Sequence, residues 1–308
     1  MIRAIASGDA EWPLVLDQLG AAAPPLLHLR GARPLSELCA EPAVAVVGAR
    51  RGSRAGEAFA YSLSRGLAVA GVAVISGLAL GIDAAAHAGA LAAGGRTVAV
   101  LGCGIDRVYP RQNRAVAAAI AERGAIVSEW GVGVEPAPWR FPVRNRLIAA
   151  LASVTVVIEA TRRSGALITA DHALALGREV LAVPGSAWSP LGEGVNALLR
   201  AGATPVTSLD DVLDTLGLTA PGPVRASALP DATPVVPGGA AGRAWRALRA
   251  EPSTPAALAF RLGLEGPELA RALVALELDG LLALEPDGRL VALTGAAIAD
   301  RATGTSLP

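Results

Sequence analysis

Short apolar runs recur along the first two thirds of the chain, and a longer segment with helical periodicity follows each one. Unbroken runs of four or five apolar residues are typical of strands that are buried on both faces of a parallel sheet. The pattern predicts strands at 44–47, 72–75, 97–101, 125–128, 154–158 and 179–183. It predicts helices at about 55–70, 83–93, 113–122, 144–152, 166–176 and 195–200.

This alternation favours right-handed βαβ units, in which helices cover both faces of a parallel sheet. We therefore expect an α/β fold, with a Rossmann-like, mostly parallel sheet and helices on both faces, over residues 41–218. Residues 1–40 are expected to form only a short lead-in to the sheet. A segment rich in proline and glycine, at 219–240, reads as a linker.

Beyond the linker, the pattern predicts three short helices at 244–250, 255–262 and 268–278 and then a hairpin that turns at 286–288. This order is typical of a winged helix, which we expect at 241–296, before a tail at 297–308. The third helix offers Arg271 against Glu265, Glu268, Glu277 and Asp279. Because phosphate would repel these acids, we favour a protein-contact or regulatory module over a reader of duplex DNA.

Composition narrows the possible functions. The chain has 308 residues, and its 27 basic residues, all arginine, balance 27 acids, so the net charge does not indicate a nucleic-acid partner. The absence of lysine excludes a P-loop lysine and a Schiff base. Two cysteines and three scattered histidines offer no disulfide framework and no metal site, so we expect no metal and no cofactor. No signal peptide or membrane-length apolar run is visible, which predicts a cytoplasmic protein without a membrane partner.

Positive charge is nevertheless concentrated in two places. Residues 48–65 contain four arginines and one acid, and residues 139–163 contain five arginines and one acid. Arg50 directly follows the strand at 44–47, and Ser53 stands where the cap of the next helix is expected. Ligands of open α/β sheets bind at the carboxyl ends of strands, beside helix starts. The pattern therefore suggests a groove for a single strand of nucleic acid.

A second arginine cluster opens the apolar helical segment 141–150. Arg144, Asn145 and Arg146 stand at its start, and two readings of the arginines are open. They either pair internally, with Glu129 or Glu159, or meet an anion, for which the planar guanidinium is well suited. Ser164, Gly165 and Thr169 follow the strand at 154–158 and add hydroxyl and backbone donors of the kind that cradle phosphate.

Taken in order, these motifs resemble the DNA-processing protein A (DprA/Smf) family over about residues 40–205. The matching residues are Val47-Gly48-Ala49-Arg50, Ser76-Gly77-Leu78-Ala79-Leu80-Gly81-Ile82-Asp83, Leu101-Gly102-Cys103-Gly104-Ile105-Asp106, Tyr109-Pro110, Asn113, Ser128-Glu129, Phe141-Pro142-Val143-Arg144-Asn145-Arg146, Glu159-Ala160, Ser164-Gly165-Ala166-Leu167-Ile168-Thr169-Ala170 and Val183-Pro184-Gly185. The resemblance implies a protein that binds and protects incoming single-stranded DNA and loads RecA during natural transformation (competence) or recombination. It also implies a winged helix at the place predicted above, and we expect no counterpart of the helical module with which many family members begin.

This interpretation assigns roles to individual residues. We expect single-stranded DNA and RecA as partners, a homodimer, and no catalytic activity. Trp139 and Phe141 are candidates for stacking on a base. Asp83 and Asp106 are expected to cap helices or hold turns, and Glu159 is expected to neutralise neighbouring arginines. The expected phosphate and DNA contacts are Arg50, Ser53, Arg144, Asn145, Arg146, Ser164, Gly165 and Thr169, with Gly48, Gly77, Gly81 and Gly104 permitting turns and close approach.

Two other classes of function stay open at this point. The first is a nucleotide-binding or nucleotide-hydrolysing Rossmann enzyme related to phosphoribohydrolases, in which Arg50, Glu129 and Glu159 would bind and activate a nucleotide. The second is a scaffold without ligand. A dinucleotide dehydrogenase is disfavoured, because Gly48-Ala49-Arg50-Arg51-Gly52 follows the first predicted strand in place of Gly-x-Gly-x-x-Gly.

Overall fold

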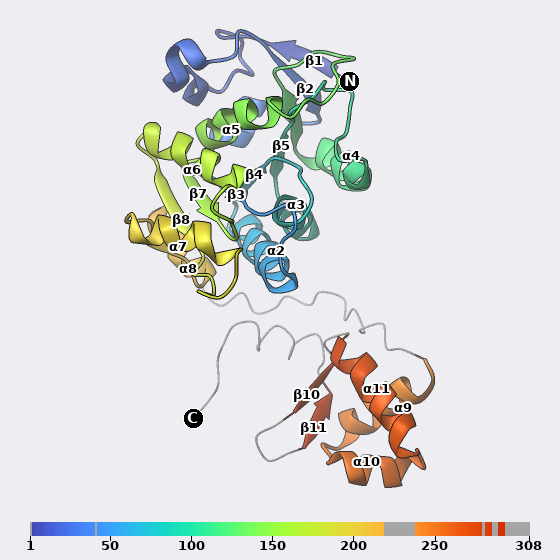
Figure 1. The fold of residues 1–308 in the computed structure, drawn as a ribbon. Coiled ribbons are helices and arrows are strands. Elements are labelled where there is room, and N and C mark those ends of the chain that lie inside the picture. Colours follow the sequence, from blue (N-terminus) through green and yellow to red (C-terminus); the bar gives the residue numbers. More distant parts are fainter. Residues whose placement is uncertain (1, 41, 219–237, 279–280, 285–288, 293–308) are drawn as a thin grey trace. The chain divides into compact units, whose positions relative to one another are not determined.

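The computed structural model describes residues 2–40, 42–218, 238–278, 281–284 and 289–292. The chain divides into two units, residues 1–222 and 223–308 (Figure 1). Most of the expected linker, the expected hairpin turn at 286–288 and the expected tail at 297–308 lie outside the described residues.

The described part of the first unit contains one nine-stranded sheet with the order β1-β2-β6-β5-β4-β3-β7-β8-β9. Neighbouring strands from β6 to β9 are parallel, while β2 runs antiparallel to β6 and β1 antiparallel to β2. The predicted mostly parallel sheet is therefore confirmed. The strands are β1 (Ile2–Ile5), β2 (Leu27–Gly31), β3 (Ala43–Val47), β4 (Ala73–Ser76), β5 (Thr97–Val100), β6 (Ala125–Ser128), β7 (Val154–Val157), β8 (Glu179–Ala182) and β9 (Thr204–Pro205).

The first 40 residues are more than a short lead-in, and that expectation is wrong. They contribute the strands β1 and β2, the 3-10 helix η1 (Leu14–Ala22) and the helix α1 (Leu35–Ala40). Along β2, Leu27 and Leu29 are fully buried while His28 and Arg30 between and after them are only partly covered. This alternation is typical of a strand with one buried and one partly exposed face. The strand β2 extends the sheet beyond β6.

Helices cover both faces of the sheet (Figure 1). Val44 and Val46 of β3 belong to a core shared with α2, α3 and α8, whereas Ala45 and Val47 face a core shared with α5, α6 and α7. No helix in the described part of the chain is long and apolar enough to cross a membrane. The helices are α2 (Arg54–Val69), α3 (Ile82–Ala92), η2 (Arg111–Asn113), α4 (Arg114–Arg123), α5 (Arg140–Leu151), α6 (Gly165–Ala175), α7 (Gly192–Arg200) and α8 (Leu209–Thr215).

The order of the strands creates a switch point beside β3. From β3 the chain proceeds through β4 and β5 to β6 on one side, and then returns to place β7 on the other side of β3. Connections after β3 and β7 therefore leave the sheet in opposite directions and open a crevice at the carboxyl ends of these strands. Ligands of doubly wound α/β folds bind in such crevices.

The second unit has its own core. Its described elements are α9 (Gly239–Ala250), α10 (Pro255–Leu262), α11 (Gly266–Leu278) and the antiparallel strands β10 (Leu282–Leu284) and β11 (Leu290–Ala292). Trp245, Leu248, Leu258 and Leu276 are buried among them. Three helices followed by a hairpin is the element order of a winged helix, which stays a prediction for this unit.

Candidate nucleic-acid interface

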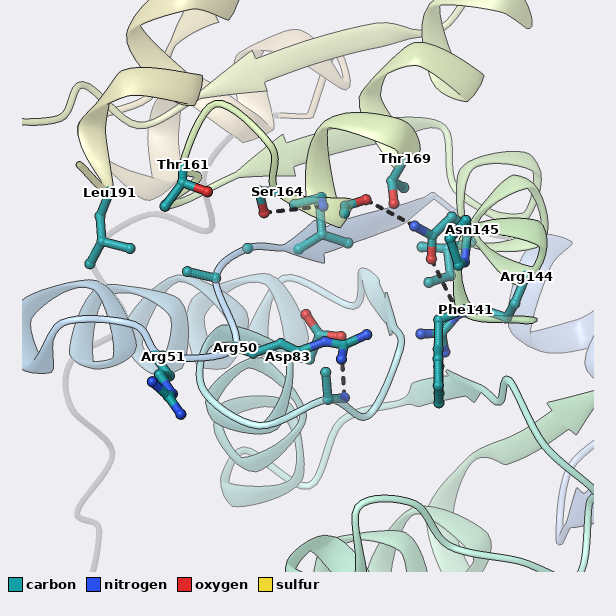
Figure 2. A pocket seen from close by; sticks show the side chains of 18 residues that line it. Arg50, Arg51, Asp83, Phe141, Arg144, Asn145, Thr161, Ser164, Thr169 and Leu191 are labelled. Atoms are coloured by element: carbon teal, nitrogen blue, oxygen red, sulfur yellow. Dashed lines mark hydrogen bonds between the residues drawn. The ribbon is translucent and has the colours of Figure 1, made fainter. Parts of the chain in front are cut away.

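A pocket of about 310 Å³ opens at the switch point (Figure 2). Its walls come from the loop after β3, the loops after β4 and β7, and the first turns of α5 and α6. The polar and charged side chains that line it are Arg50, Arg51, Asp83, Arg144, Asn145, Thr161, Ser164 and Thr169.

Arg50 and Arg51 bring two cations to the pocket from the loop after β3. Both side chains are exposed. The guanidinium carbon of Arg50 lies 5.1 Å from the ring centre of Phe141, which also lines the pocket. A guanidinium over an aromatic face is attracted by the ring while its N–H groups stay free for other acceptors. Arg50 is thus pre-positioned at the pocket, and it forms no ion pair with any acid in the described ranges.

Arg144 supplies a third cation from the buried side of the pocket. Its side chain is only 4% exposed, and its Nη1 donates to the carbonyl oxygens of Gly77, at 2.8 Å, and of Val100. Burial lowers the pKa of Arg144 to about 10, so the guanidinium is still protonated at neutral pH. Within the described residues Arg144 forms no ion pair. Backbone carbonyl oxygens hold the guanidinium in place, and the charge of the buried Asp83 attracts it without a direct ion pair.

Asp83 fixes the loop that holds Arg144. Its Oδ2 accepts hydrogen bonds from the backbone N–H groups of Gly77, at 3.2 Å, and Ala79, at 3.3 Å. Burial raises the pKa of Asp83, and the nearby charge of Arg144 acts in the opposite direction. Asn113, the last residue of η2, donates to the carbonyl oxygens of Leu78 and Ala79 in the same loop. The expectation that Asp83 holds a turn is confirmed.

Glycine is required where this loop and its neighbours approach the pocket. A Cβ on Gly77 would lie 2.5 Å from Nη2 of Arg144, and one on Gly81, whose φ is 74°, would lie 2.5 Å from the carbonyl oxygen of Ala49. Gly48 is tight against Ile82. Gly104 makes its close approach to Gly131, away from the residues that line the pocket.

The start of α6 forms the opposite wall. Ser164 caps the helix by accepting from the backbone N–H of Ala166, at 3.3 Å. Asn145 joins α5 to α6, because its Nδ2 donates to the carbonyl oxygen of Gly165 at 2.9 Å while its Oδ1 accepts from Nε of Arg144. The positive end of the α6 dipole therefore faces the same space as the arginines.

Arg146 and Ser53, two of the expected contacts, lie outside the pocket lining. Arg146 makes a two-pronged ion pair with Glu129, with Nη2 to Oε2 at 2.6 Å and Nη1 to Oε1 at 2.9 Å, so the internal-pairing reading holds for this residue. Arg144 and Arg146 are two positions apart on a helix and so point to different sides.

Ser53 caps α2 as expected, but its hydroxyl also forms a hydrogen bond with the carboxylate of Glu159. It accepts from the N–H of Gly56 and donates to Oε1 of Glu159 at 2.6 Å, while its backbone N–H donates to Oε2 of Glu159. Both oxygens of Glu159 are thus bound by Ser53. Within the described residues Glu159 forms no ion pair with an arginine, and its expected neutralising role stays a prediction.

Sequence reasoning missed Arg51, Thr161 and Leu191 as lining residues. Arg51 was detectable, because it follows Arg50 in the loop that was already assigned to the site. Thr161 and Leu191 carry no such signal, because they meet at the pocket only where the loops after β7 and β8 pair, with the N–H of Ala160 donating to the carbonyl oxygen of Leu191. Arg162, in contrast, does not line this pocket, and its Nε lies 3.8 Å from Oε2 of Glu193.

The fold and this pocket define a Rossmann-like α/β protein with arginines gathered at the carboxyl ends of its parallel strands. A family model described as DNA recombination-mediator protein A matches residues 3–217. The chain belongs to this family, and the resemblance inferred from the motifs is confirmed.

Individual relatives agree with this assignment. The DNA processing protein DprA of Streptococcus pneumoniae is 43% identical over 191 residues, which are 62% of this chain and 66% of the relative. Protein Smf of Escherichia coli is 44% identical over 174 residues, 56% of this chain and 46% of the relative. The chain thus spans less than two thirds of the length of these curated relatives.

Two solved structures share the fold. The X-ray structure of DNA processing protein A from Streptococcus pneumoniae superposes with a TM-score of 0.65 at 39% identity, covering 69% of this chain and 74% of that one. A structure of DNA processing protein A from Helicobacter pylori, described for its single-stranded DNA binding mode, gives a TM-score of 0.63 at 29% identity, covering 70% of this chain and 95% of that one.

Proposed function

We propose that this chain binds single-stranded DNA at the pocket beside β3 and acts as a recombination mediator. The observation that carries the proposal is the convergence of Arg50, Arg51 and Arg144 on one pocket. Carbonyl oxygens hold Arg144, and an aromatic ring holds Arg50, so these cations remain available to phosphate. The start of α6, with Ser164, Gly165 and Thr169, adds hydroxyl and backbone donors on the facing wall.

A single strand suits this site better than a duplex. The cations are gathered in a recessed pocket on a chain whose net charge is zero, and a flexible strand can lower a phosphate into such a recess. The rigid surface of a duplex would meet few of the same donors. The description of the Helicobacter pylori relative as a single-stranded DNA binder supports this choice.

The pocket supports binding without catalysis. The enzyme alternative would use a carboxylate near the reacting atoms as its general acid or base, and Glu129 and Glu159 were the candidates. Both are engaged elsewhere, with Arg146 and Ser53, and neither lines the pocket. Asp83 does line it, but its Oδ2 is occupied by two backbone N–H groups. Arg146 and Ser53 then act as supports that hold α5 and the loop after β3 in place.

We further propose that the bound strand is protected and handed to RecA in natural transformation or recombination, and that the protein works as a homodimer. These parts of the proposal rest on membership of the family.

Fluorescence anisotropy with a labelled oligothymidylate tests the proposal. We expect saturable binding, with an unlabelled oligothymidylate competing much better than a duplex of equal length, and no base release from adenosine monophosphate. Equal competition by the duplex would contradict the single-strand assignment. Base release from the monophosphate would instead support the enzyme alternative.

A further inference from the structure

An aromatic cluster lies next to the pocket, around the start of α5. The indole rings of Trp130 and Trp139 meet edge to face, with ring centres 6.4 Å apart. The guanidinium carbon of Arg140 lies 5.8 Å from the ring centre of Trp130 and 4.9 Å from that of Trp139. We name these three residues, Trp130, Trp139 and Arg140, the aromatic ledge.

The ledge combines order with exposure. Trp139 is 59% exposed although Arg140 lies over its ring and Trp130 packs against its edge. A ring that is already fixed by two neighbours loses little conformational freedom when a ligand stacks on it. Tryptophan is enriched at binding interfaces, because its ring is largely apolar while its indole N–H can still form a hydrogen bond.

Arg140 keeps the ledge positively charged. Its Nη1 donates to the backbone carbonyl oxygen of Glu135, and within the described residues it forms no ion pair. The nearby carboxylate of Glu135 is instead paired with Arg107 at 2.8 Å. A base that stacks here would bring its phosphate close to an arginine that no acid has neutralised.

The ledge is continuous with the pocket along the chain. Trp139 and Arg140 precede Phe141, which forms part of the pocket wall and contacts Arg50. Phe141 also packs against Tyr109, with ring centres 5.5 Å apart, and Tyr109 is 46% exposed. Aromatic side chains thus stand on the loop after β5, with Tyr109 against Phe141, and on the loop after β6, with Trp130 against Trp139.

We propose that the aromatic ledge is a nucleobase-stacking subsite, which takes a base of the strand whose phosphates occupy the arginine pocket. This inference rests on the proposed function. The two surfaces recognise different parts of the strand: the pocket binds the phosphate backbone, and the ledge binds the flat face of a base. Stacking on an aromatic ring tolerates any base, so the subsite adds affinity without sequence preference.

The test compares two ligands on each variant. One is a labelled oligothymidylate, and the other is an abasic oligomer with the same sugar-phosphate backbone and length. Trp139→Ala should weaken binding of the oligothymidylate at least fivefold, which corresponds to about 1 kcal/mol, and leave binding of the abasic oligomer unchanged. Trp139→Phe should recover most of the loss, since it retains a ring.

Val132→Ala is the matched control, because Val132 is 66% exposed in the same loop and takes no part in the ring contacts of the ledge. It should bind both ligands as the unaltered protein does. The inference is overturned if Trp139→Ala binds the oligothymidylate with unchanged affinity, or if its affinity for the abasic oligomer falls by the same factor. It is also overturned if Val132→Ala weakens binding of the oligothymidylate as much as Trp139→Ala does. Failure of the unaltered protein to bind either ligand would instead contradict the proposed function itself.

Discussion

Replacing Arg144 by alanine should both destabilise the protein and weaken its binding of single-stranded DNA. The side chain is 4% exposed and donates to the carbonyl oxygens of Gly77 and Val100. Each buried carbonyl that loses its donor costs about 1–3 kcal/mol. Two of them give a loss of about 2–6 kcal/mol, a large share of the roughly 5–15 kcal/mol that stabilises a typical domain. Asp83 also loses the nearby positive charge that opposes the effect of its burial.

Urea unfolding followed by circular dichroism measures this loss, and oligonucleotide anisotropy at low urea measures binding by the folded fraction. Arg50→Ala is the matched control, because Arg50 is an exposed arginine of the same pocket. It should change the free energy of unfolding by less than about 0.5 kcal/mol while still weakening binding. An Arg144→Ala protein as stable as the Arg50→Ala protein would refute the claim that carbonyl oxygens hold Arg144.

Three further predictions concern Gly77, His87 and the second unit. Gly77→Ala should weaken DNA binding without removing a charge, because the new Cβ would lie 2.5 Å from Nη2 of Arg144 and displace the guanidinium; unchanged affinity would contradict this. Burial, together with the charge of Arg144, lowers the pKa of His87 to about 3 from 6.5, so the unfolded chain binds the extra proton between these values and stability should fall as the pH falls through that window. His87→Gln should lose this component, up to about 1.4 kcal/mol per pH unit, in urea unfolding at pH 7, 6 and 5. A chain that ends at Leu218 should keep its affinity for single strands, because no described residue beyond that point belongs to the cores of the sheet; a tenfold loss on truncation would assign part of the site to the second unit.

Much of the sheet was predictable because its strands are buried on both faces. Val44 to Val47 is an unbroken apolar run and Val154 to Val157 is apolar except for Thr155, and the structure places both inside the sheet. The strand β2 gave a weaker signal, since Leu27 and Leu29 alternate with the partly covered His28 and Arg30. Its antiparallel partner β6 is about 100 residues away in the chain, so no local pattern could announce the pairing.

The candidate site was predictable at its strand ends and less so on its helix. Arg50 could be placed because the chain leaves a central strand there, where ligands of this fold class bind. The opposite fates of Arg144 and Arg146 depend on which face of α5 each occupies, and a spacing of two already indicates that both cannot face one site. Only the tertiary structure shows that Arg146 forms an ion pair with Glu129 and that Ser53 donates a hydrogen bond to Glu159.

The central claim is that phosphate of a single strand is bound by the cations of the pocket beside β3. Its most direct test is the salt dependence of oligothymidylate affinity for the unaltered protein and for Arg50→Ala, measured by anisotropy. Loss of one phosphate contact should lower affinity and flatten the slope of log K against log salt by about 0.7. The account predicts both changes together, with thermal melting unaltered. An Arg50→Ala protein with the same affinity and the same salt slope as the unaltered protein would contradict it.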